Sequence, residues 1–299
     1  MAYKPKFNAD LLDDVVKRKV VLFVGAGASM WAKPRGGGSF KSWSKFLNLA
    51  CSKVSDSKTR RLIASCIEKG DYLIASELLK NELSEKWYPI LSAEFQQAAD
   101  ISRLHRALIA LDQRIIVTTN FDKLIETAWA EVTQGRYPNV IHKVDQKAFR
   151  LFRDDDPYLI KLHGSIDDPE TIVFDKTSYQ RAAFANQFYR ELIGTLLLTH
   201  TFIFVGFSMD DPAISLVVES HAYRYSDTRP HYIFTSGIPN RPIDELSKSL
   251  RRLFVLRYSE KNHHEALAEA LEALGHEARE RRRLLFVTDS EWGQKPPKS

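Results

Sequence analysis

Four short segments of this chain carry residue types that can bind a phosphorylated ligand or move a proton. The first is the run Gly25, Ala26, Gly27, Ala28 and Ser29. Glycines let a backbone turn tightly and let a pyrophosphate approach closely, and the free N–H groups of a following helix attract the anion. Ser29 can add a hydroxyl donor. Because the third glycine of the dinucleotide fingerprint is missing, the run also fits a tight turn that holds no ligand.

A second segment offers an amide and a carboxylate, and a third offers an imidazole. Asn120 and Asp122 follow a run of β-branched residues, where they can face a ligand. Asn120 equally suits the cap of a helix starting at Lys123, because asparagine is a preferred capping residue. His163, which is followed by Gly164, can act as a base near neutral pH. A lone histidine is more often structural, so its meaning depends on the other segments.

The fourth segment is the turn Gly206, Phe207 and Ser208, which precedes a predicted helix start. All four segments directly follow short apolar runs of strand length. Such runs, β-branched or aromatic and without polar alternation, are typical of buried parallel strands. The predicted strands lie at residues 20–24, 114–119, 158–162, 202–205, 231–235 and 253–256.

Helix-length connections separate these runs, which predicts an α/β fold, a Rossmann-like doubly wound parallel sheet with helices on both faces. In such a sheet the ligand lies at the carboxyl ends of the strands, where the strand order reverses. Each of the four segments that could bind a ligand or move a proton directly follows a predicted strand. We therefore expect all four segments to meet at this edge of the sheet.

Residues 1–299 are predicted to form a single domain with two helical additions. Residues 44–111 show apolar residues at helical spacing and no clear strand, which indicates a helical subdomain inserted into the sheet topology. A shorter helix is expected at 186–198, and residues 262–299 are predicted to form a C-terminal helical tail. We expect neither the insertion nor the tail to help build the ligand pocket.

The composition is that of a globular protein, with 44% hydrophobic and 27% charged residues. The formal net charge of +5 is dispersed along the chain, and no nucleic-acid recognition module is evident in the sequence. Cys51 and Cys66 cannot supply a four-cysteine metal site, and no other ligand cluster stands out. No apolar run approaches the roughly 20 residues that span a bilayer, and the first residues do not form a secretory signal. The expected location is the cytoplasm, with no membrane partner and with both thiols reduced.

In this order, the four segments resemble the sirtuin family, which shows a GAGxS loop, a T-x-N-x-D segment, a histidine followed by glycine, and a G-x-S turn. The resemblance extends from about residue 20 to about residue 235. It implies NAD as the ligand, with the glycine loop at the pyrophosphate and the G-x-S turn near the adenosine half. The residues to which it assigns these contacts are Gly25, Ala26, Gly27, Ser29, Gly206 and Ser208.

The same resemblance gives roles to the polar residues that follow the middle strands. Asn120 would lie by the nicotinamide ribose and Asp122 near the nicotinamide amide, while His163 would be the catalytic base. Nicotinamide is already cationic in NAD and leaves as a neutral base, so its departure needs no general acid. Asn120 would fix a water molecule or a ribose hydroxyl, and His163 would accept a proton.

Two departures from the family bear on the reaction. Protein deacylases of the family carry a four-cysteine zinc module, and a G-I-P-D/E-F-R segment follows their first loop; this chain has two cysteines, and residues 30–40 read differently. The chain therefore resembles the sirtuin-like NADases of bacterial antiviral defence, in which NAD is a substrate and no metal is expected. Two alternatives are a deacylase that has replaced zinc with packing and a sensor that binds NAD or ADP-ribose without hydrolysing it.

The resemblance also bears on partners. Members of the NADase group often work in large assemblies, some with a HerA-type ring ATPase and others with Argonaute-like proteins. It implies that this chain is a gated defence effector and a homo-oligomer, with a HerA-type ATPase as a candidate partner. The surfaces we nominate for such contacts are the insertion and the tail up to residue 285.

Overall fold

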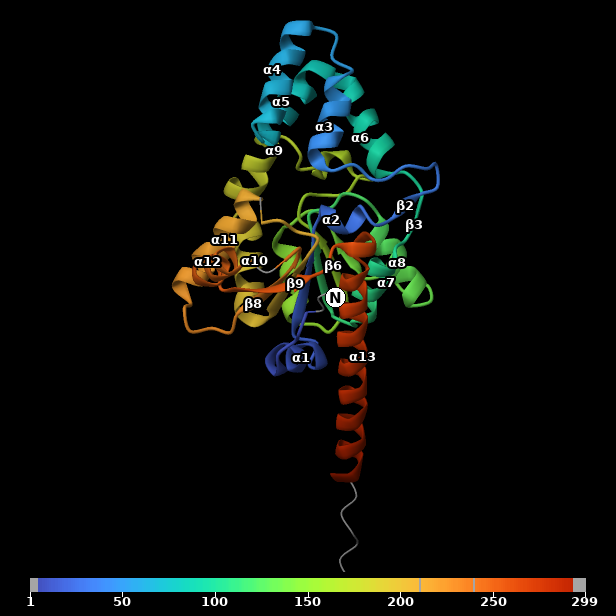
Figure 1. The fold of residues 1–299 in the computed structure, drawn as a ribbon, viewed down its shortest axis with the longest axis vertical. Helices are drawn as coiled ribbons and strands as arrows, with labels where there is room; N and C mark the ends of the chain where they lie inside the picture. Colours follow the sequence, from blue (N-terminus) through green and yellow to red (C-terminus); the bar gives the residue numbers. More distant parts are fainter. Residues whose placement is uncertain (1–4, 210, 239, 293–299) are drawn as a thin grey trace, which may run out of the picture.

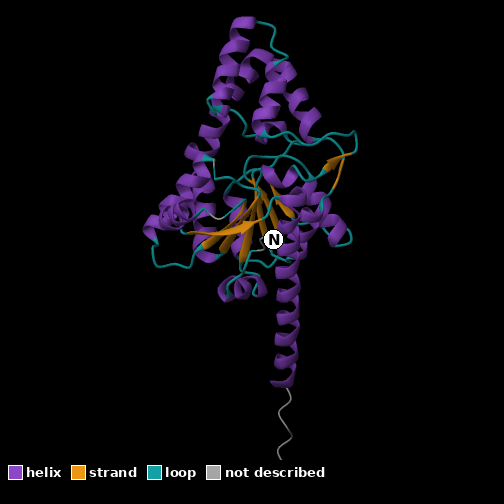
Figure 2. Cartoon of the chain, viewed as in Figure 1, coloured by secondary structure: helices purple, strands orange, loops and turns teal. Residues whose placement is uncertain are grey.

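The computed structural model describes residues 5–209, 211–238 and 240–292. A central layer of strands lies between helices, a group of helices sits at one end of it, and one long helix extends from the other end (Figure 1). Figure 2 shows the same arrangement by element type, with the strands enclosed by helices. This architecture confirms the predicted α/β, Rossmann-like fold with helices on both faces of a parallel sheet.

In the described part of the chain, seven strands form one sheet in the order β5-β6-β4-β1-β7-β8-β9, and all neighbours pair in parallel. The strands are β1 (Val20–Val24), β4 (Ile115–Thr118), β5 (Asn139–Ile141), β6 (Tyr158–Lys161), β7 (Thr201–Val205), β8 (His231–Ser236) and β9 (Leu253–Tyr258). A separate antiparallel pair consists of β2 (Lys33–Pro34) and β3 (Ala99–Asp100).

The strand order reverses at β1. From β1 the chain first forms β4, then the edge strand β5 and then β6, which lies between β5 and β4; it then crosses back to place β7 on the other side of β1. This reversal creates the crevice in which doubly wound sheets hold their ligands. The six predicted strands are all present, whereas β5 and the short pair of β2 and β3 were not predicted. β5 is a three-residue edge strand with exposed Asn139 and Val140, so it lacks the apolar run that marks buried strands.

Alternate residues of β1 lie in two different apolar cores, one on each face of the sheet. Val20, Leu22 and Val24 belong to one apolar cluster, and Val21 and Phe23 belong to the other. The first face is covered by α1 (Ala9–Val16), α7 (Arg103–Ala110), α8 (Leu124–Val132) and α13 (Lys261–Trp292). The second is covered by η2 (Gln146–Phe152), α9 (Lys176–Gln180), η4 (Arg181–Ala185), α10 (Gln187–Thr199) and α11 (Pro212–Arg224). Three further elements are α2 (Ala26–Ser29), η3 (Pro169–Thr171) and α12 (Arg241–Arg251).

The region predicted as a helical insertion forms the group of helices at the top of Figure 1. It contains α3 (Trp43–Cys51), α4 (Ser57–Glu68), α5 (Tyr72–Leu83), η1 (Ser84–Lys86) and α6 (Trp87–Phe95), and it continues into β3 and α7. Its helices enclose a third apolar core in which Phe46 is fully buried. Phe121 and Phe174, from the loops after β4 and β6, belong to the same core. The insertion is thus packed onto the carboxyl edge of the sheet.

The C-terminal tail forms α13, whose apolar face is buried against its own chain. Leu267, Leu271 and Leu274 lie in the first core, where α13 contacts α1 and α7. Arg103 of α7 adds ion pairs to Glu265 and Glu272. The predicted tail residues 293–299 lie outside the described residues. In the part of the chain that is described, no helix is both long and apolar enough to cross a membrane.

Candidate active site

The register of the sheet brings the four predicted segments to one edge. Thr118 of β4 lies beside Val24 of β1 on one side and beside Lys161 of β6 on the other. Val24 also lies beside Val205 of β7. These residues are the last of their strands, so all four segments leave the sheet from one row. The predicted convergence of the segments is therefore a consequence of the strand pairing.

The glycine loop and the Gly206 turn touch each other directly. The N–H of Gly27 donates to the carbonyl oxygen of Gly206, and the N–H of Gly25 donates to that of Val205, both at 2.9 Å. A Cβ at Gly25 would lie 2.4 Å from the Gly206 oxygen, and Gly206 itself has a positive φ of 62°. The glycines are thus required for packing one turn on another. Two N–H groups that we expected to face a pyrophosphate are used inside the protein.

Asn120, Ser29 and Asp122 form a buried hydrogen-bonded network that joins the first two segments. Nδ2 of Asn120 donates to the Gly25 carbonyl at 3.0 Å and to Oγ of Ser29 at 2.9 Å. The Ser29 hydroxyl in turn donates to Oδ2 of Asp122 at 2.6 Å. Oδ1 of Asp122 accepts from the N–H of Leu124, at the start of α8, at 3.0 Å. The alternative of Asn120 as a simple helix cap is therefore wrong, because Asp122 makes the contact to the helix.

The amide oxygen of Asn120 is buried and has no hydrogen-bond partner among the described residues. The orientation of the amide is fixed, because the Gly25 carbonyl can only accept and so requires the NH₂ group. A buried acceptor without a partner costs about 1–3 kcal/mol and calls for an explanation. A hydroxyl group of a bound sugar or a water molecule would satisfy it.

A buried lysine ties the loop that carries Asn120 to the loop that carries His163. Only 1% of Lys161 is exposed, and its Nζ donates to the carbonyls of Phe121 and Asp122 at 3.1 and 2.6 Å. Nζ also lies 2.9 Å from Oε1 of Glu126, which supplies the opposite charge. A charge this deeply buried is stable only when paired and hydrogen-bonded. Lys161 therefore holds the turn between β4 and α8 in place.

His163 follows β6 and is paired with a carboxylate that follows β7, on the other side of β1 in the sheet. Its Nε2 lies 3.2 Å from Oδ2 of Asp211, which follows the Gly206 turn, and about 11% of each side chain is exposed. Burial raises the pKa of Asp211, but hydrogen bonds from His163, the Ile214 N–H and Tyr179 outweigh it and hold the pKa below its ordinary value. The predicted base thus carries an ionised partner.

A second histidine lies close to the Asn120 network. His105 of α7 is 1% exposed, and its Nδ1 lies 2.7 Å from Oγ of Ser102. Burial lowers the pKa of His105 to about 4, although the negative charge of nearby Asp122 acts in the opposite direction. His105 is therefore neutral at physiological pH.

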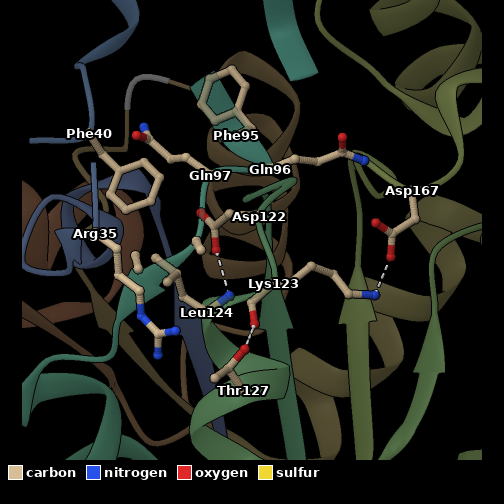
Figure 3. Close-up of a pocket in the computed structure, with 12 residues that line it drawn as sticks. Arg35, Phe40, Phe95, Gln96, Gln97, Asp122, Lys123, Leu124, Thr127 and Asp167 are labelled. Atoms are coloured by element: carbon tan, nitrogen blue, oxygen red, sulfur yellow. Dashed lines mark hydrogen bonds and ion pairs between the residues drawn. The ribbon is translucent and has the colours of Figure 1, made fainter. Parts of the chain in front are cut away.

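A pocket of about 460 Å³ lies beside Asp122. Figure 3 shows Asp122 in the middle of its lining, with Phe40 on one side and the Lys123–Asp167 ion pair on the other. Its lining residues are Arg35, Phe40, Phe95, Gln96, Gln97, Ala98, Ala99, Asp122, Lys123, Leu124, Thr127 and Asp167. This volume suits a small ligand or one end of a larger one. Residues 95–99 belong to the insertion, so the insertion contributes to the lining of this pocket.

The structure separates the predicted residues into groups. The contacts above unite Gly25, Gly27, Ser29, Asn120, Asp122 and Gly206, whereas His163 is paired with Asp211. Ala26 and Ser208 are exposed at the same edge. Among the described residues, no group of three or more His, Cys, Asp or Glu side chains could hold a metal ion.

Lys161 and Asp211 are functional candidates that the sequence reasoning missed. Lys161 stands inside an apolar strand, and a lysine within a buried run is itself a signal of a paired charge. Asp211 lies three residues beyond Ser208, in a segment interpreted only as a helix start. Its link to His163 joins residues 48 positions apart, so spacing alone could not reveal it.

Comparison with known proteins places these residues in a family context. Residues 114–267, slightly more than half of the chain, match the family described as the SIR2-like domain. An NAD(+) hydrolase ThsA from Bacillus cereus (strain MSX-D12) is 27% identical over 242 residues, which cover 80% of this chain and 48% of the relative. An NAD(+) hydrolase ThsA from Enterococcus faecium is 29% identical over 226 residues, 73% of this chain and 43% of the relative.

A further relative is named for defence. Defense-associated sirtuin 2 from Bacillus subtilis is 25% identical over 228 residues, which cover 74% of this chain and 21% of the relative. The chain thus spans about half, or less, of the length of the relatives that it matches.

Proposed function

The chain belongs to the SIR2-like domain family, and we propose that it hydrolyses NAD to ADP-ribose and nicotinamide as a gated effector of antiviral defence. The observation that carries this proposal is the buried amide of Asn120. Its NH₂ group is linked through Ser29 to Asp122, which lines a pocket, and its oxygen has no hydrogen-bond partner among the described residues. The names of the relatives support NAD as the substrate and defence as the setting.

The reaction breaks the bond between nicotinamide and ribose through an oxocarbenium-like state. In our proposal the pocket beside Asp122 receives the nicotinamide end, and the Asn120 oxygen accepts a hydroxyl of the ribose or of the attacking water. His163 accepts the proton that this water loses. The electrons of the broken bond pass to the nicotinamide nitrogen, so no acid has to protonate the leaving group.

The contacts expected for the rest of NAD follow the resemblance. Gly25, Ala26, Gly27 and Ser29 would line the pyrophosphate, and Gly206 with Ser208 would face the adenosine half. Because Gly25 and Gly27 use their N–H groups inside the protein, exposed Ala26 and Ser208 are the more accessible members of this set. The reaction as proposed uses no metal ion.

The decisive experiment is to incubate the purified protein with NAD and to separate the products by chromatography. Equal amounts of ADP-ribose and nicotinamide would support hydrolysis. Release of nicotinamide only in the presence of an acyl-lysine peptide would favour the deacylase alternative, which the shortage of cysteines disfavours. Saturable NAD binding without turnover, under every condition of assembly, would favour the sensor.

Unregulated cleavage would deplete the NAD of the host cell, so we propose that contacts with other chains gate the activity. The partners that we propose are further copies of this chain or a separate HerA-type ATPase. We place the protein in the cytoplasm, where its free cysteines, Cys51 and Cys66, would stay reduced. Light scattering on the purified protein should report a mass well above 34.3 kDa, and a monomer that is fully active alone would contradict this gating.

A further inference from the structure

A chain of contacts links Tyr179 of α9 through Asp211 to His163. Oδ2 of Asp211 lies 3.2 Å from Nε2 of His163, and both side chains are largely buried. The other carboxylate oxygen, Oδ1, accepts from the Tyr179 hydroxyl at 2.7 Å and from the N–H of Ile214 at 3.1 Å. The carboxylate is thus fixed by α9 and by the first turn of α11 before it reaches the histidine.

We propose that Asp211 is a positioning residue that holds Nε2–H of His163, so that Nδ1 is the ring nitrogen that accepts the proton in catalysis. The part of this inference that concerns catalysis rests on the proposed NAD hydrolysis. In a neutral imidazole one nitrogen donates and the other accepts, and the hydrogen bond of one nitrogen sets the role of the other. A carboxylate can only accept, so it selects the tautomer with hydrogen on Nε2.

The surroundings of the pair keep this carboxylate ionised. Among the described residues, the titratable groups that face it include His163, Tyr179 of α9 and Tyr189 of α10. Burial, followed by the nearby Asp211 and Tyr179, raises the pKa of Tyr189 well above its ordinary value, so this phenol stays neutral. Asp211 therefore has hydrogen-bond donors on both oxygens and remains an acceptor for the histidine.

The proton then follows a balanced path. Nδ1 takes a proton from the attacking water while the water oxygen bonds to C1′ of the ribose and the C1′–nitrogen bond breaks toward nicotinamide. The ring becomes an imidazolium whose Nε2–H still points at Asp211, and the carboxylate stabilises this charge. The imidazolium finally releases the proton to solvent.

Asp211 also caps α11 through Ile214, and the substitution Asp211→Asn separates the two tasks. Asparagine is as good a cap as aspartate, so the melting temperature should stay near that of the parent protein. Its NH₂ group donates toward Nε2 and favours hydrogen on Nδ1, which removes the acceptor. We expect kcat to fall about 10²- to 10⁴-fold with little change in KM.

Two further variants test whether Asp211 acts through His163. The double variant His163→Ala/Asp211→Asn should be no slower than His163→Ala alone, because the second change has nothing left to position. Tyr179→Phe leaves the Asp211–His163 pair in place and should lower kcat less than Asp211→Asn does. A residue that only stabilised the fold would instead lower activity independently in the double variant.

The tautomer can be read without any catalysis. Long-range ¹H–¹⁵N correlation spectra of ¹⁵N-histidine-labelled protein distinguish Nε2–H from Nδ1–H, and His163→Ala identifies the signals of His163. The parent protein should show Nε2–H at this residue and Asp211→Asn should show Nδ1–H. Nδ1–H in the parent, or unchanged kcat in Asp211→Asn, would overturn the inference. Nε2–H in a protein that never cleaves NAD would support the pairing and refute the proposed function instead.

Discussion

At the scale of single residues, the two ends of the Asn120 amide have different tasks. Its NH₂ group binds the glycine loop and Ser29, and its oxygen has no hydrogen-bond partner among the described residues, which in the proposed mechanism leaves it for the substrate. A capping asparagine would have used its oxygen on the helix, as Asp122 does here. The side chain is therefore at once a structural link between two strands and a candidate contact to substrate.

Replacing Asn120 by alanine tests both tasks. Loss of the amide removes the donor to Oγ of Ser29 and one of the two donors to the buried Gly25 carbonyl, which keeps the Ala28 N–H; this should lower the free energy of unfolding by about 1–3 kcal/mol. Because the protein remains folded, the loss of NAD cleavage should be far larger than this change in stability explains. Chromatography of the products and denaturant unfolding measure the two effects. Asn81→Ala, an exposed asparagine of α5, is the control and should change neither.

Replacing His163 by alanine removes the proposed base. A positioned general base contributes about 10²–10⁴-fold, and the rate of NAD hydrolysis should fall by a factor in this range. The exposed histidine of α13 in the variant His276→Ala serves as the control. NAD hydrolysis at the parental rate by His163→Ala, under activating conditions, would remove His163 from the mechanism.

At the scale of elements, the ammonium group of buried Lys161 holds the loops after β4 and β6 through hydrogen bonds to both. Lys161 donates to the carbonyls of the Asn120 loop and neutralises Glu126 of α8. Lys161→Met should lower the free energy of unfolding by about 3–5 kcal/mol, because it leaves Glu126 buried without its partner. Urea denaturation measures the loss. The double variant Lys161→Met/Glu126→Gln should recover part of it, and a single variant as stable as the parent would contradict this account.

The same loops show which features of the fold and the site can be predicted from the sequence. Apolar runs predicted six strands and the segments that follow them, because strand burial and strand-end chemistry are local properties. The packing of the insertion against the sheet was not predicted, because it depends on Phe121 and Phe174, which enter the core of α3 to α6 from distant loops. Asp211 was missed for the same reason, since its partner lies on another strand.

At the scale of the whole molecule, α13 is an integral part of the fold, because its apolar residues are buried in the first core. It lies against α1, near the beginning of the chain, and against α7, which follows the insertion. Removing the tail from residue 262 onward would therefore expose the first core, and a loss of assembly in that deletion could not be separated from unfolding. Point substitutions along the same helix distinguish its buried part from its exposed part.

Leu271→Ala and Leu284→Ala form such a pair on α13. Leu271 is fully buried, so its truncation should cost about 2–5 kcal/mol of unfolding free energy. Leu284 is 62% exposed, and its truncation should change stability by less than about 0.5 kcal/mol. Thermal or urea denaturation gives both numbers. Equal losses, or none at Leu271, would mean that the tail does not pack on the core as described.

Buried histidines make the whole fold sensitive to mild acid. Burial lowers the pKa of His105 to about 4 and that of His231, helped by the charges of His221 and Arg252, to about 3. Both stay neutral in the folded protein, whereas in the unfolded chain they gain protons near the ordinary value of 6.5. The unfolded state therefore binds more protons below pH 6.5, and the free energy of unfolding falls as the pH falls.

Each pH unit between 6.5 and these lowered values costs about 1.4 kcal/mol per histidine. Carboxylates with lowered pKa values, such as Asp211, act only below about pH 4, so the window from pH 7 to pH 5 isolates the histidines. Urea unfolding at the two ends of this window should show the loss. His231→Asn keeps an acceptor for the Phe202 N–H and should flatten the dependence, whereas the exposed His276→Asn should leave it unchanged. If the parent protein were as stable at pH 5 as at pH 7, these histidines could not be buried in the neutral form.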